Sequence, residues 1–212
     1  MPITIREIIA RLHEHAPLTL AEPWDNAGLL LGDLDREAAS ILIGLDPTTS
    51  LVAEAIALGA DTIITHHPLI FKPLAAINTA EPTGRFIEMA LSHRISVIAC
   101  HTNLDSAAGG VSDALAKAIG LNEVQPLVAG SAAADLHQGL GRIGRFPEAV
   151  SAAILLRRLG KALQLPALFI AGRLPASIST VALCGGSGSD LAAVAYARGA
   201  EVYITAEIKR HV

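Results

Sequence analysis

Aromatic and charged side chains are scarce in this chain. Aromatic residues make up 3% of its 212 residues, charged residues 17%, and the formal net charge is −4. Proteins that bind nucleic acid usually carry a basic surface, and those that bind single strands stack bases on aromatic rings. The composition therefore argues against a nucleic-acid partner.

Long apolar runs are also missing, and there are only two cysteines. No run reaches the about 20 apolar residues of a membrane-spanning helix, and the first residues lack the apolar core of a signal peptide. Cys100 and Cys184 each close an apolar run, where buried thiols are more typical than a disulfide. We expect a soluble cytoplasmic protein with no membrane partner.

Hydrophobic residues are abundant, at 51% of the chain, and they occur in short segments. A strand over 40–45, a helix over 50–58 and a second strand over 61–65 form a βαβ unit, which implies parallel strands. Gly59 is placed to end the helix in the left-handed conformation. This pattern is typical of an α/β protein.

The same unit returns later in the chain, which indicates an internal repeat. A shift of 140 residues aligns 41–67 with 181–207. Eight positions are identical to those 140 residues later: Leu51, Ala53, Ala55, Ala57, Gly59, Ala60, Ile64 and Thr65. We predict two similar α/β domains with mostly parallel sheets flanked by helices, the first over 1–125 and the second over 126–212.

A pair of histidines stands out at the end of the second strand. The apolar run over 62–65 leads into His66 and His67, and Pro68 stops the strand because proline has no amide hydrogen. Open α/β sheets bind ligands at the carboxyl ends of their strands. Neighbouring strand side chains point to opposite faces, so only a break at the strand end lets both rings converge on one site.

A second apolar strand, over 95–100, runs into His101 and Asp105. Imidazoles and a carboxylate suit a transition metal with open positions. We predict His66, His67 and Asp105 as ligands of one or two divalent ions, with zinc, iron or manganese as candidates. If the carboxylate bridges two ions, they lie about 3.5–4 Å apart and activate a water.

Other polar residues have more than one interpretation. His101 can be a ligand, a residue that orients a ligand or an acid–base group; orientation is favoured, and we expect His101 to serve proton transfer in catalysis. Trp24 is best explained as a packing anchor. Asp25 and Asn26 can hydrogen-bond their own turn or approach the site, and the turn is favoured. The Gly185–Gly188 stretch can receive an anion, but a tight strand-to-helix turn is the better explanation.

Several motifs together resemble the Nif-three-like family, whose members are known as type-two homologues of GTP cyclohydrolase I. In chain order these motifs cover residues 24–29, 65–74, 101–105, 139–144, 185–188 and 203–209. The resemblance implies a two-domain α/β protein with a dinuclear metal centre, assembled as a toroidal homohexamer. It places metal ligands on His66, His67 and Asp105 and implies a hydrolase or cyclohydrolase acting on a nucleotide.

One departure from the family pattern concerns the end of the chain. Family members continue past the equivalent of His211 into a stretch whose His and Glu complete the metal site, whereas this sequence ends at Val212. The candidates for substitution are Glu207, His211 and His101. We also expect an exposed sheet edge in the second domain. The alternative function is a non-catalytic, metal-binding hexameric scaffold.

Overall fold

The computed structural model of this protein describes residues 3–130 and 136–209. Contacts divide the chain into two compact units, Met1–Leu104 and Asp105–Val212. The sequence placed the boundary later, after residue 125, which lies inside strand β7 (Asn122–Ala129) of the second sheet. Each unit has its own four-stranded sheet, and the first also has a two-stranded one.

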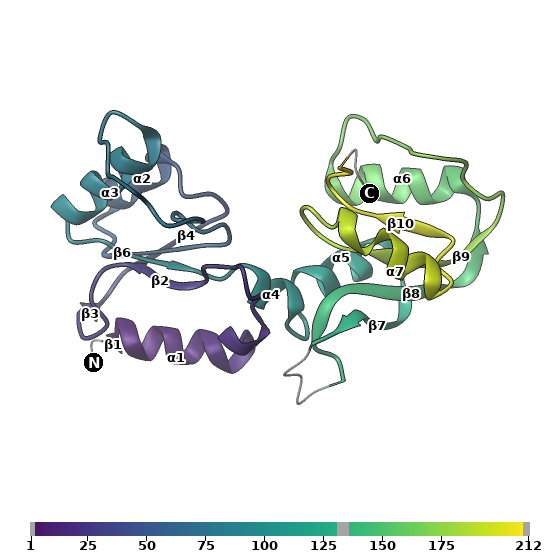
Figure 1. Cartoon of the computed structure of the whole chain (residues 1–212), viewed down its shortest axis with the longest axis horizontal. Helices are drawn as coiled ribbons and strands as arrows, with labels where there is room; N and C mark the ends of the chain where they lie inside the picture. The colour runs from purple at the N-terminus through teal and green to yellow at the C-terminus, as the bar shows by residue number, and fades with distance from the viewer. Residues whose placement is uncertain (1–2, 131–135, 210–212) are drawn as a thin grey trace. The chain divides into compact units, whose positions relative to one another are not determined.

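The first unit arranges its main sheet in the order β2-β6-β5-β4 (Figure 1). Strands β4, β5 and β6 are parallel, and β2 is antiparallel to β6. The elements are β1 (Ile3–Thr4), α1 (Ile5–His15), β2 (Gly28–Leu31), β3 (Glu37–Ala38), β4 (Ile41–Gly44), α2 (Thr49–Leu58), β5 (Thr62–Thr65), α3 (Pro82–Ser92) and β6 (Ser96–Ala99). A 3-10 turn covers Leu18–Leu20, and α4 (Thr102–Ser106) contains the junction between the units.

Local signals in the sequence explain where the helices begin and end. The Thr4 hydroxyl accepts the Glu7 amide hydrogen and the Glu7 carboxylate accepts that of Thr4, which is a capping box at the start of α1. Helix α2 ends at Gly59, whose φ of 69° is left-handed, as the sequence predicted.

Helices cover both faces of the first sheet (Figure 1). Val52 of α2 and Phe86 of α3 pack with Ile63 of β5 on one face. On the other face, Ile8 of α1 packs with Ile64. Ile63 and Ile64 are consecutive and point to opposite faces, so β5 is buried on both sides. Burial of these side chains specifies the register of the strand. This fixes the end of β5, from which the histidine pair follows.

The second unit has the sheet order β10-β9-β8-β7, in which β9 and β10 are parallel. Strand β8 is antiparallel to both neighbours, so this sheet is mixed whereas the first is mostly parallel. Its further elements are α5 (Val111–Ile119), β8 (Gly139–Val150), α6 (Ala152–Leu163), β9 (Ile178–Leu183), a 3-10 turn (Ser189–Leu191), α7 (Ala192–Ala197) and β10 (Val202–Ile204). Among the described residues, no helix combines the length and apolar character that a membrane span requires.

Strand pairing confirms the internal repeat. In the first unit Ile41 of β4 pairs with Thr62 of β5, and in the second Val181 of β9 pairs with Val202 of β10. Both residues of the second pair lie 140 positions after those of the first, as in the sequence alignment. The two strand–helix–strand units therefore share one architecture in the same register.

In each strand–helix–strand repeat, an acidic residue just before the second strand (β5 or β10) makes equivalent hydrogen bonds. The carboxylate of Asp61 accepts the amide hydrogens of the two residues before β4, and that of Glu201 does so at the start of β9. The donors are Ala39, Ser40, Ser179 and Thr180, at distances of 2.6–3.3 Å. These bonds lower the pKa of Glu201. The sequence alignment matches these two acids without identity, so the structure extends the repeat.

Candidate metal centre

Two adjacent parallel strands bring three histidines together. His66 and His67 follow β5, and His101 follows β6, whose Ala99 pairs with Thr65 at the end of β5. The ring centroids of His66 and His67 are 4.9 Å apart. The ring centroid of His101 lies 5.3 Å from that of His66 and 5.7 Å from that of His67. Each ring offers a nitrogen within 4.8 Å of the nitrogens of the other two.

The predicted break after β5 is what lets the two neighbouring rings converge. The Thr65 hydroxyl donates to the His67 carbonyl oxygen at 2.8 Å, and this bond turns the chain at the strand end. Pro68 follows immediately, where it cannot extend the sheet. The two rings therefore lie side by side instead of on opposite faces.

Each of the three rings has an acceptor facing its Nδ1 atom. The contacts join His66 to the Cys100 carbonyl oxygen at 2.8 Å, His67 to Asp46 Oδ1 at 2.6 Å, and His101 to Asp25 Oδ1 at 2.7 Å. An acceptor at Nδ1 selects the tautomer with hydrogen on Nδ1 and the lone pair on Nε2. Metal-binding histidines are held in this way by carboxylates and carbonyl groups.

Asp25 lies in the candidate site, which is the role that the sequence analysis ranked below hydrogen bonding within its own turn. Its carboxylate is fully buried, and besides His101 it accepts hydrogen bonds from the Thr102 amide at 3.0 Å and the Thr102 hydroxyl at 2.5 Å. Burial acts to raise the pKa of Asp25, but the hydrogen bonds from His101 and Thr102 outweigh it and the pKa is lowered. The side chain is therefore a carboxylate that orients His101.

The predicted turn role of Asp25 is also present, because its carboxylate accepts the Asn26 amide hydrogen at 2.7 Å. The sequence alone does not favour the second role, since His101 lies 76 residues further along the chain. Only the strand order of the sheet brings these two side chains together.

Trp24 is not the packing anchor that we predicted, because 58% of its surface is exposed. Its ring contacts Phe71 edge-on, with centroids 5.7 Å apart. Both rings also have their centroids 6.3 Å from that of His101. The tryptophan therefore lies beside the histidine cluster and not in the core.

The remaining predicted ligands and substitutes stay predictions. Asp105 lies in α4, four residues after His101, and is half-buried. Glu207 follows β10 and is exposed, and its carbonyl oxygen accepts the Ser189 hydroxyl hydrogen at 2.7 Å. His211 lies outside the described residues.

The glycine-rich stretch of the second unit forms the tight turn that the sequence favoured. The Gly188 amide donates to the Thr205 hydroxyl at 2.9 Å, and the Tyr203 hydroxyl donates to the Gly188 carbonyl oxygen at 2.6 Å. Gly186, with a φ of 60°, supplies the left-handed residue of the turn. The Gly188 amide, one of the donors that a bound anion would need, is thus already engaged by Thr205.

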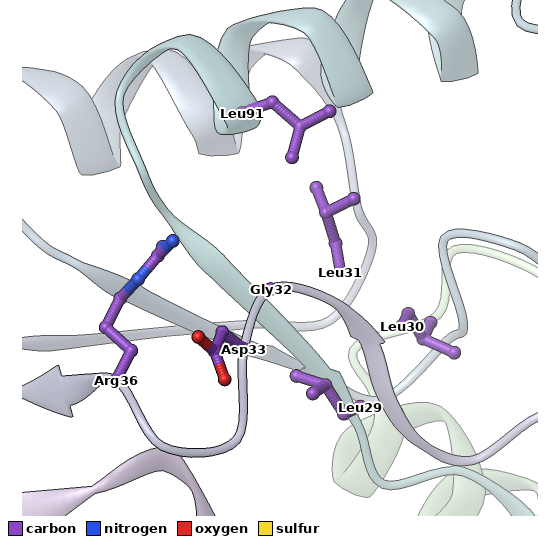
Figure 2. A pocket seen from close by; sticks show the side chains of 7 residues that line it. All are labelled: Leu29, Leu30, Leu31, Gly32, Asp33, Arg36 and Leu91. Carbon is purple, nitrogen blue, oxygen red and sulfur yellow. The ribbon is translucent and has the colours of Figure 1, made fainter.

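A separate depression of about 460 Å³ lies along strand β2 (Figure 2). It is lined by Leu29, Leu30, Leu31, Gly32, Asp33, Arg36 and Leu91. The Arg36 guanidinium donates to the Arg94 carbonyl oxygen at 2.5 Å, and Asp33 accepts the Asp35 amide hydrogen at 3.0 Å. Its polar groups are thus engaged in structural hydrogen bonds, and none of the three histidines lines it.

The fold and the histidine cluster define a class of protein: a two-unit α/β chain with three histidines at its strand ends that could hold a metal ion. The family model of Duf34/NIF3 (NGG1p interacting factor 3) matches residues 3–212, and the chain belongs to this family. The resemblance seen in the sequence motifs is thereby confirmed.

Relatives and solved structures agree with this assignment. The chain is 35% identical to a "GTP cyclohydrolase 1 type 2 homolog" of Streptomyces coelicolor, covering 98% of this chain and 73% of that protein. A protein of the same name from Clostridium perfringens is 32% identical, with 98% and 78% covered. The crystal structure of a Bacillus cereus protein related to NIF3 superposes with a TM-score of 0.90 at 25% identity, covering 100% of this chain and 84% of that one.

Proposed function

We propose that this protein binds divalent transition-metal ions through His66, His67 and His101 and acts as a metal-dependent hydrolase on a nucleotide-type substrate. The observation that carries the proposal is the convergence of three imidazoles, each with an acceptor at Nδ1. The names of the relatives supply the substrate class. We further propose that it works in the cytoplasm, which is consistent with its two buried free cysteines.

The donor chemistry fits such an ion. Imidazole nitrogen suits zinc and iron, and a carboxylate such as the predicted ligand Asp105 extends the choice to manganese. When bound, a divalent ion supplies Lewis acidity and activates water as a nucleophile near neutral pH. The chain contributes fixed tautomers, because the acceptors at Nδ1 hold each ring before the ion arrives.

Metal analysis of purified protein tests the site. We expect His66→Ala, His67→Ala and His101→Ala each to lose bound metal, measured by mass spectrometry of the metal content after dialysis. The control is His93→Ala, an exposed histidine at the end of α3 whose ring contacts only its own helix at the Met89 carbonyl oxygen among the bonds described. Wild-type metal content in all three site variants would end the proposal.

The His101→Ala variant distinguishes a metal-ligand role from a proton-transfer role in the same experiment. As a ligand, its loss lowers the metal content as much as the loss of His67. Retained metal with lost turnover would instead assign His101 the proton-transfer role predicted from the sequence. Asp105→Ala tests the predicted carboxylate ligand by the same measurement.

Turnover distinguishes the hydrolase from its rival. Metal-loaded protein is incubated with GTP and other nucleotides, and the products are separated by chromatography. Activity that a chelator removes and metal restores supports the enzyme. Tight metal retention without turnover of any nucleotide supports the non-catalytic scaffold.

We also propose that the chain assembles as a homohexamer in which the open edge of the first sheet pairs with a second copy. In the part of the chain that the structure describes, β4 is the outer strand, and Ile43 is 74% exposed. Its repeat counterpart, Leu183, is 0% exposed and packs in the core of the second unit. Strand β9, which carries Leu183, pairs antiparallel with β8 along the corresponding edge. An exposed apolar edge strand is a template for pairing with another chain.

In the second unit the corresponding edge pairs with an antiparallel strand. A two-fold axis perpendicular to β4 would place the β4 strand of a second copy antiparallel to it in the same way. We expect Ile43→Lys to lower the molar mass measured by light scattering. The control Leu58→Lys changes an exposed leucine of the same unit and should leave the molar mass unchanged. A monomeric wild-type protein would contradict the assembly, and an unchanged mass in Ile43→Lys would exclude this edge.

A further inference from the structure

Two of the few aromatic rings of this chain lie exposed next to the histidine cluster. The sequence has one Trp, two Tyr and four Phe. Trp24 is 58% exposed and Phe71 47%, and both rings contact each other and His101. We propose that Trp24 and Phe71 form an aromatic platform that binds the planar base of the substrate. This inference rests on the proposed function, since it assumes a nucleotide beside the metal site.

The arrangement of the rings suits a stacking site. Trp24 and Phe71 meet at an interplanar angle of 61° with centroids 5.7 Å apart, which is an edge-to-face contact. Such a contact supports both rings while much of their surface stays open to solvent. A base stacked on this surface would lie next to His101, whose centroid is 6.3 Å from each ring.

Hydrogen bonds fix the backbone on which both rings stand. Asp25, next to Trp24, is held by His101 and Thr102 through its buried carboxylate. The Asn26 side chain donates to the Ile70 carbonyl oxygen at 2.5 Å, one residue before Phe71. The turn that carries Trp24 is therefore tied both to the histidine cluster and to the loop that carries Phe71.

This fixed backbone distinguishes the platform from a chance exposure of apolar side chains. Ordering a loop on binding costs conformational entropy, and a ring that is already positioned avoids that cost. Stacking is tolerant of base identity because every base has a π-face. The platform is therefore expected to select a planar ring and not a particular base.

The single tryptophan makes the test direct, because all tryptophan emission comes from Trp24. Metal-loaded, full-length protein is titrated with guanosine 5′-monophosphate and, separately, with ribose 5-phosphate, which lacks a base. We expect saturable quenching by the nucleotide and none by the sugar phosphate. Equal quenching by both would show that the site reads phosphate, which overturns the proposal.

Variants of the second ring measure its contribution. We expect Phe71→Leu to weaken nucleotide binding by about 5- to 100-fold, as is typical of losing a stacked base. The matched control is Phe169→Leu in the second unit, an exposed phenylalanine, which should leave affinity unchanged. Trp24→Leu is measured by equilibrium dialysis with labelled nucleotide, since it removes the fluorophore, and should show a similar loss.

Two outcomes separate this inference from the function on which it rests. Normal metal content without nucleotide quenching overturns the platform and leaves the metal site standing. Wild-type protein that retains no metal overturns the proposed function itself. A Phe71→Leu variant with unchanged nucleotide affinity but altered molar mass would assign the rings to a protein interface and overturn the platform.

Discussion

Replacing Asp25 by Asn tests whether the buried carboxylate sets the orientation of His101. Asp25 accepts three hydrogen bonds from His101 and Thr102 at 2.5–3.0 Å. The amide of Asn has the same shape, but its nitrogen can only donate. In Asp25→Asn the amide nitrogen faces either the Thr102 amide, which loses its partner, or His101 Nδ1, which can then accept only if the ring hydrogen moves to Nε2.

The magnitude follows from burial. Residues that hold a metal-binding histidine typically change metal affinity by about 10- to 100-fold when they are mutated. We expect Asp25→Asn to lower the metal affinity by a factor in this range, because the Asp25 side chain is 0% exposed and the His101 side chain is 15% exposed. Asp46 makes the equivalent contact with His67, but both side chains are about half exposed. An exposed pair contributes about 0–1 kcal/mol, so Asp46→Asn should cost at most about fivefold.

The assay is a competition titration of zinc against a chromophoric chelator, performed on both variants and the wild type. Thermal unfolding of the metal-free proteins serves as the control, since loss of a charge-assisted hydrogen bond also costs about 1.5–3 kcal/mol of stability. The reasoning is refuted if folded Asp25→Asn binds zinc as tightly as the wild type while His101→Ala does not. Equal losses in the two Asn variants would show that burial does not determine the effect.

Further predictions concern stability. Asp113→Asn removes the carboxylate that pairs with the buried Arg142 guanidinium and should lower the free energy of unfolding by about 3 kcal/mol in a urea titration. Burial acts to raise the pKa of Asp113, but the hydrogen bond from Arg142 acts to lower it, and on balance the pKa is lowered. The stability that the pair contributes is therefore present above about pH 4 and is lost as the pH falls through the lowered pKa of the folded state. Acid titration of the wild type and the variant would show this loss. Ile63→Ala, at a fully buried position between the strands and α2, should cost about 2–5 kcal/mol in the same urea assay. Gly188→Ala should cost about 1–3 kcal/mol, because the added methyl carbon would lie 2.6 Å from the Tyr203 hydroxyl oxygen, and an unchanged midpoint would contradict this clash.

Much of the fold could be predicted because its signals are local. Gly59 ends α2, the burial of Ile63 and Ile64 on opposite faces follows from strand geometry, and the 140-residue repeat reappears in the strand register. The mixed second sheet could not be predicted, because antiparallel pairing of β8 with β9 depends on contacts between segments distant in sequence. Strand direction is a property of the assembled sheet and leaves little trace in one strand.

The candidate site divides in the same way. His66 and His67 are visible in the sequence because a strand break lies beside them. The sequence does not favour Asp25 or Trp24 as site residues, because their turn reaches His101 only through the folded sheet. Turn chemistry explains Asp25 and packing explains Trp24 when each is considered alone, so no local signal favours the second role.

The repeat also explains why, within residues 3–130 and 136–209, only the first unit carries a histidine cluster. In the first unit β5 lies between β4 and β6, so the ends of these three strands supply the rings and two of the three acceptors at Nδ1. In the second unit β10 is the outer strand among the described residues, and Thr205 after it ties down the glycine turn instead. The three rings follow two neighbouring parallel strands, β5 and β6, and among the described residues the second unit has no strand beyond β10 that would correspond to β6. The same strand–helix–strand unit thus supplies a candidate metal site in one half and a closed structural turn in the other.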